Sequence, residues 1–74
     1  MTKLAIPTRK IVNFDGNTST TIHYIGEAAF GVEDSEAFWR IYALVYTGSN
    51  FTLRFADGDD DFNKVWDNRL SYIY

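Results

Sequence analysis

Residues 38–56 hold the feature that most limits what this chain can fold into: two runs of β-forming residues around a short turn signal. The runs over 38–46 and 51–56 are rich in aromatic and β-branched side chains, and Gly48-Ser49 stands between them. Such runs around a two-residue glycine turn are typical of a tight β-hairpin. The turn sets a register with four facing pairs: Tyr46 with Phe51, Leu44 with Leu53, Tyr42 with Phe55, and Arg40 with Asp57 as an ion pair.

Both faces of this hairpin carry apolar side chains. One face, which we expect to be the main core face, carries Tyr42, Leu44, Tyr46, Phe51, Leu53 and Phe55. The other is apolar on its first strand and mixed on its second, with Trp39, Ile41, Ala43 and Val45 beside Thr52, Arg54 and Ala56. Strands that are apolar on both sides are usually buried on both sides, and 74 residues offer little material to cover two faces. The pattern therefore favours a protein partner, and the expected partner contacts are Trp39, Ile41, Val45, Tyr72 and Tyr74.

The first part of the chain predicts a second hairpin. Residues 1–9 have little pattern and are expected to form an N-terminal arm. The β-rich runs over 10–14 and 20–25 flank Asp15-Gly16-Asn17, which is strong turn chemistry. Two glycines within 26–31 predict a loop there.

The last part of the chain predicts a helix and a strand. Phe62, Val65, Trp66 and Arg69 recur at helical spacing, which predicts a short helix over 62–69, and the apolar run over 70–74 predicts a last strand. The expected fold is a single mainly β domain over residues 10–74, an antiparallel sheet, sandwich or barrel of about five strands with one short helix.

The composition excludes several kinds of metal and ligand site. The chain has no cysteine and one histidine, His23, which excludes disulfides, cysteine-zinc sites and histidine-rich metal sites. Its 10 acidic and 7 basic side chains give a net charge of −3, whereas nucleic-acid binding needs a basic face. No apolar run approaches the roughly 18 residues of a membrane-spanning helix. We therefore expect no cofactor, no nucleic-acid partner and no membrane contact.

The acidic turn at Asp57, Asp59 and Asp61 is the sharpest candidate for a metal site, because alternating aspartates are the early ligands of a calcium loop. That pattern then requires glycine and a late glutamate where this chain has Phe62 and Asn68. We therefore interpret the aspartates as a solvated turn that caps the following helix, and keep them only as weak metal candidates.

No group of residues in the sequence assembles a catalytic site. His23 lies in a β-rich run, and the sequence pairs no serine or cysteine nucleophile with it. A carboxylate pair such as Glu27 and Glu33 would need a cleft, and a domain this small offers little depth for one. Most aromatic residues, including Trp39 and Trp66, are expected in the core. The sequence therefore predicts a binding or structural protein and not an enzyme.

Three segments stand out as a set: Tyr24-Ile25-Gly26-Glu27-Ala28-Ala29, Phe38-Trp39-Arg40-Ile41, and Ala56-Asp57-Gly58 running on to 61–69. In this order and spacing they resemble a family of very short proteins encoded in tailed-bacteriophage genomes. In that family a YIGEA segment precedes a WRI strand, and an ADG turn leads to F-x-x-VWDxR. The resemblance covers residues 22–74, and Phe30 stands where proline is common in the family. Because members lie among virion-structure genes, the resemblance implies a phage structural component.

The leading hypothesis is therefore a bacteriophage virion structural protein that binds other virion proteins, as a tail or fibre adaptor or as capsid cement. It would be located in the virion and form homo- or hetero-oligomers there. Two alternatives stay open: a small phage-encoded host-interaction or inhibitor protein, and a carbohydrate-binding module that uses exposed tryptophan or tyrosine.

Overall fold

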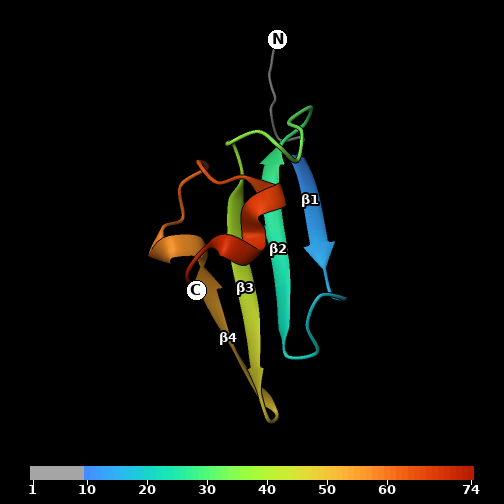
Figure 1. The fold of residues 1–74 in the computed structure, drawn as a ribbon, viewed down its shortest axis with the longest axis vertical. Coiled ribbons are helices and arrows are strands. Elements are labelled where there is room, and N and C mark those ends of the chain that lie inside the picture. Colours follow the sequence, from blue (N-terminus) through green and yellow to red (C-terminus); the bar gives the residue numbers. More distant parts are fainter. Residues whose placement is uncertain (1–9) are drawn as a thin grey trace.

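The computed structural model describes residues 10–74, which form one open antiparallel sheet of four strands (Figure 1). The strands are β1 (Lys10–Asp15), β2 (Ile22–Ala29), β3 (Arg40–Thr47) and β4 (Asn50–Phe55), and they lie in chain order. Two short 3-10 segments follow, η2 (Ala56–Gly58) and η3 (Trp66–Ser71). The prediction of a mainly β, antiparallel fold is confirmed. The predicted arm over residues 1–9 lies outside the described residues.

Both predicted hairpins form. In the β3–β4 hairpin the register pairs Tyr42 with Phe55, Leu44 with Leu53 and Tyr46 with Phe51, as the Gly48-Ser49 turn predicted. Gly48 takes a φ of +62°, in the left-handed region that glycine adopts at little cost, so the two-residue turn closes without strain. β1 and β2 pair from Lys10 opposite Ala29 to Asp15 opposite Tyr24.

The ends of two strands differ from the prediction. Residues 26–29, expected in a loop, continue β2, because Gly26 pairs with Asn13 on one side and with Ile41 on the other. β4 ends at Phe55, and the chain then turns through η2. The predicted ion pair between Arg40 and Asp57 is therefore wrong, and Arg40 instead binds Glu27 on β2.

The predicted helix over 62–69 and the predicted strand over 70–74 do not form. Trp39 and Lys64 make an isolated antiparallel bridge, with N–H to carbonyl hydrogen bonds of 2.9 and 2.8 Å in the two directions. This bridge holds the chain extended, so only the six residues Trp66–Ser71 coil, as a 3-10 helix. The described structure thus has four strands rather than five, and the aspartates at 59–61 cap no helix. Within residues 10–74 no helix is long and apolar enough to cross a bilayer.

The segment after β4 covers one face of the sheet, which we call the inner face, and leaves the opposite outer face open. Figure 1 shows η3 lying across β2 and β3. The buried apolar residues all belong to this inner layer or to its cover: Tyr24, Ala28, Trp39, Ile41, Ala43, Ala56 and Trp66. The prediction that Tyr42, Leu44, Tyr46, Phe51, Leu53 and Phe55 form the main core face is therefore wrong.

Side-chain size explains why the cover lies on the inner face. The indole of Trp66 packs directly over Gly26, which has no side chain, and the small residues Ala28 and Ala43 belong to the same buried cluster. The rings of Trp39 and Trp66 lie 5.9 Å apart between centroids. Arg69 then fixes the cover to β1, because its Nε donates a 3.0 Å hydrogen bond to Oδ2 of Asp15.

Candidate interaction surface on the outer face

The outer face consists of three rows of side chains that run across the strands. The central row joins all four strands, since Phe14 faces Ile25, Ile25 faces Tyr42, and Tyr42 faces Phe55. A second row holds His23, Leu44 and Leu53, and a third holds Tyr46 and Phe51. Val12 extends the surface on β1. The outer face is thus defined by Val12, Phe14, His23, Ile25, Tyr42, Leu44, Tyr46, Phe51, Leu53 and Phe55.

The outer face is largely open to solvent. Phe14 and Phe51 are each 61% exposed, Val12 is 57% exposed and Leu53 is 46% exposed. These residues come from both edge strands, β1 and β4, so the exposed apolar surface spans the width of the sheet. Contiguous apolar patches of more than a few hundred Å² are rare on soluble monomers and usually mark interaction sites.

The aromatic rings of the outer face pack against one another. His23 lies between Phe14 and Tyr46, with ring centroids 5.4 and 5.0 Å away in edge-to-face geometry. Tyr42 makes an edge contact with Phe55 at 5.5 Å. These mutual contacts restrict the rings before any partner arrives, which lowers the entropy lost on binding.

One end of the outer face is polar. Glu27 accepts hydrogen bonds from the guanidinium of Arg40 and from the Tyr42 hydroxyl, the latter at 3.2 Å, and Lys10 lies 4.0 Å from the same carboxylate. Burial pushes the pKa of Glu27 upward, but these donors and positive charges outweigh burial and hold the pKa below its usual value. The opposite happens at Tyr42, where burial and the charge of Glu27 raise the pKa of the phenol. The carboxylate of Glu27 therefore stays ionised and paired within the chain at neutral pH.

The structure places the predicted partner contacts elsewhere. Trp39 and Ile41 are fully buried in the inner layer, so they are closed to any partner in this structure. Val45, Tyr72 and Tyr74 are partly buried and pack against the same core. Six residues of the outer face are instead the ones that the sequence predicts as core: Tyr42, Leu44, Tyr46, Phe51, Leu53 and Phe55. The signal that separates the two faces is the set of small residues on the inner face, which marks where a covering segment fits.

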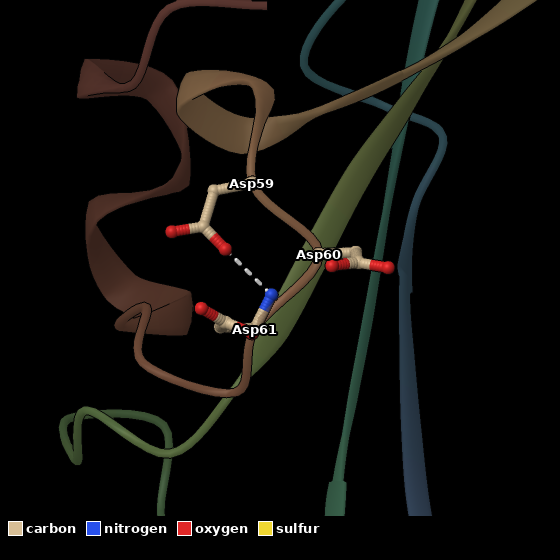
Figure 2. A group of neighbouring side chains, drawn as sticks. All are labelled: Asp59, Asp60 and Asp61. Carbon is tan, nitrogen blue, oxygen red and sulfur yellow. Dashed lines mark hydrogen bonds between the residues drawn. The ribbon is translucent and has the colours of Figure 1, made fainter.

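The acidic turn serves the fold. Asp57 is not part of the cluster that the other three aspartates form. Its carboxylate instead accepts a 3.0 Å hydrogen bond from the backbone N–H of Ile73. Carboxylate oxygens of Asp59, Asp60 and Asp61 lie within 4.8 Å of one another, and Figure 2 shows these three side chains around one bend of the chain.

Asp59 is already engaged within this turn. It accepts a 2.6 Å hydrogen bond from the Asp61 N–H, drawn in Figure 2, and lies 3.3 Å from Nζ of Lys64. The hydrogen bond from Asp61 is the main reason that the pKa of Asp59 is lowered. Lys64 is buried, so the paired aspartate offsets the cost of burying its charge. The turn therefore supports the Trp39–Lys64 bridge.

Among residues 10–74, the ring of His23 contacts the rings of Phe14 and Tyr46, and His23 faces Leu44 across the β2–β3 pair. A general base needs a proton donor within hydrogen-bonding reach, and no hydroxyl or carboxylate is in that position here. The arrangement around His23 can pack against another apolar surface.

No protein-family model matches the chain, and no curated protein and no solved structure matches it either.

Proposed function

We propose that this chain is a bacteriophage virion structural protein that binds other virion proteins through its outer face. Two lines support the proposal. The YIGEA, WRI and ADG…VWDxR segments resemble short proteins encoded among virion-structure genes. The observation that carries the proposal is the outer face itself, an apolar sheet surface left uncovered by the rest of residues 10–74.

Leaving the outer face in contact with water costs free energy, because its apolar area is large. Five of its side chains are between 37% and 61% exposed: Val12, Phe14, Tyr46, Phe51 and Leu53. At roughly 150–200 Å² for a large apolar side chain, they present on the order of 400 Å² to water. Covering that area at about 25 cal/mol per Å² is worth roughly 10 kcal/mol before the costs of association. Covering this face with a partner surface therefore contributes strongly to the free energy of association.

The inner face alone provides a small core. Among residues 10–74, seven apolar residues are buried there. Domains of this size bury about 60–65% of their unfolded surface and are marginally stable, and assembly with other subunits adds stability by mass action. A virion subunit keeps its neighbours permanently, so it tolerates an incomplete core of its own.

The role in the particle is tested by mass spectrometry of purified particles of the phage that encodes the chain. We expect the chain to be present in stoichiometric amounts relative to other virion proteins. A phage carrying Leu53→Glu should lose the chain from its particles, whereas Thr52→Glu should keep it, because Thr52 is also exposed on β4 but on the opposite face.

Absence of the unmodified chain from particles would refute the virion role. Capture of a bacterial protein by the outer face, combined with that absence, would favour the host-interaction alternative. Both tryptophans are buried, at 0% and 6% exposure for Trp39 and Trp66, so a carbohydrate-binding surface built on exposed tryptophan has no support in this structure.

A further inference from the structure

We infer that the occupant of the outer face is a second copy of this chain, with the two sheets packed face to face. The inference rests on the proposed function, because it identifies the first virion protein that the chain binds as another copy of itself. The product would be a sandwich of two four-stranded sheets, in which each copy covers the face that residues 10–74 of the other leave open.

The outer face is broad enough to form the centre of a contact between two copies. Four strands about 4.8 Å apart, with roughly six residues each at about 3.3 Å per residue, span a face of about 19 by 20 Å. Side-chain relief raises the buried area above this flat value, towards the roughly 800 Å² per partner of a standard interface. A short peptide lying across one or two strands would cover only part of the three rows.

The shape of the outer face suits a second sheet. Twisted antiparallel sheets pack face to face at about 30° with roughly 10 Å between them, and their inward side chains interdigitate. The outer face combines bulky rings with smaller aliphatic groups, as where Phe14 faces Ile25 and His23 faces Leu44. Each of its three rows also contains apolar residues, as the inward face of a sandwich does.

The charge of the outer face permits self-association. The chain carries a net charge of −3, but the acidic turn over 57–61 lies beyond the end of β4. The charges on the outer face gather at its polar end, where Lys10 and Arg40 both pair with Glu27. Two copies therefore bring together surfaces without an excess of like charge, whereas a strongly charged partner would find little complementarity here.

Sedimentation equilibrium of the full chain over a wide concentration range tests the inference. We expect a species of twice the 8.5 kDa chain mass at high concentration, in exchange with monomer on dilution. Leu53→Lys should raise the dimer dissociation constant at least about tenfold, because it places a charge in the apolar contact. Thr52→Lys adds the same charge on the same strand but faces away, and should leave the dissociation constant unchanged within about twofold. Circular dichroism confirms that each variant keeps its sheet.

The position of the contact needs a second measurement, because strand-edge pairing would also give a dimer. In a mixed sample of isotope-labelled and unlabelled chains, face-to-face packing predicts intermolecular NOEs from the methyl groups of Ile25 and Leu44, which lie on the two central strands. Edge pairing leaves these methyl groups without intermolecular NOEs and would overturn the inference.

The outcomes separate the inference from the proposed function. A chain that stays monomeric at all concentrations, yet is present in particles, overturns the second copy as occupant and leaves the virion role standing. A chain that dimerises through its outer face but is absent from particles supports the second copy as occupant and refutes the virion role. Equal effects of Leu53→Lys and Thr52→Lys on the dimer would also contradict the face-to-face contact.

Discussion

Gly26 and Trp66 are in direct contact, and the absence of a side chain at Gly26 is what admits the indole. A Cβ placed on Gly26 would lie 2.7 Å from Cζ3 of Trp66 and closer still to Cε3. Real Cβ atoms do not approach carbon so closely, so any larger residue at position 26 must displace the tryptophan. The pair fixes which face of the sheet is covered, and it thereby decides which face stays open.

The Gly26–Trp66 contact predicts a penalty for added volume. We expect Gly26→Ala to lower the free energy of unfolding by about 1–3 kcal/mol in urea denaturation, as overpacking does in a tight core. The cost should shrink by at least about half in a Trp66→Leu background, where the ring no longer opposes the new methyl group. Additive effects of the two substitutions would show that the contact does not govern the cover.

The corrected position of the core predicts unequal costs for truncating the two faces. Ile41 is fully buried on the inner face, so Ile41→Ala should cost about 2–5 kcal/mol of unfolding free energy. Leu53 is 46% exposed on the outer face, so Leu53→Ala should cost less than about 1 kcal/mol when the chain is dilute. Equal costs in thermal or urea unfolding would contradict the assignment of the faces.

The tie between Asp15 and Arg69 predicts acid sensitivity. Hydrogen bonds from Thr18 are the first cause that holds the pKa of Asp15 far below its usual value; burial opposes them, and Asn17 and Arg69 add to them. A carboxyl whose pKa is lower in the folded state contributes stability above its unfolded pKa, near 3.9, and loses it as pH falls further. Asp15→Asn should therefore cost about 1–3 kcal/mol at pH 7 and flatten the fall in stability below about pH 4.

The exposed aspartate Asp60 provides the control for the acid prediction. Asp60→Asn removes the same charge from the surface of the turn after η2. Urea unfolding at a series of pH values should give nearly the unmodified profile for Asp60→Asn. An Asp15→Asn variant that keeps the full acid dependence would remove Asp15 from this account.

The hydroxyl of Tyr74 predicts the opposite pH dependence. It donates a 2.7 Å hydrogen bond to the carbonyl of Arg69, and burial, followed by neighbouring Tyr24, Tyr72 and Asp57, raises its pKa. Because the folded state holds this proton more tightly, the Tyr74 hydroxyl contributes fully to folding stability below about pH 10. This contribution is lost as pH rises further.

Tyr74→Phe should therefore cost about 0.5–1.5 kcal/mol at neutral pH and reduce the loss of stability in alkali. Tyr46→Phe, on the outer face, serves as the matched control and should leave the alkaline limb unchanged. An alkaline limb that is identical in Tyr74→Phe and the unmodified chain would refute the role given to this hydroxyl.

Local pattern in the sequence predicts the hairpins but not the face that is covered. The Gly48-Ser49 turn and the alternation around it determine the β3–β4 register, because a two-residue turn allows only one pairing of the two strands. Which face is buried depends on η3, and η3 reaches the sheet through the Trp39–Lys64 bridge between segments 25 residues apart in sequence. Helical spacing over 62–69 gave no hint of that bridge, because β-pairing between distant segments leaves no local period.

The three segments 24–29, 38–41 and 56–69, which stand out in the sequence as a set, lie in the covered layer of the fold. In the first, Tyr24 and Ala28 are buried and Gly26 admits Trp66. In the second, Trp39 and Ile41 are core residues. Arg69, in the third, reaches Asp15. These residues build the covered layer, so the three segments explain how the fold closes and do not point to the outer face.

Covalent footprinting of exposed side chains tests the role of the outer face most directly. Carbene labelling of intact particles and of the dilute isolated chain compares the same residues with and without partners. We expect Phe14, Phe51 and Leu53 to lose most of their labelling in particles, while Ile73 and Leu70, which are exposed on the covering segment, change less. Equal labelling of the outer face in both samples would contradict its role as an interface.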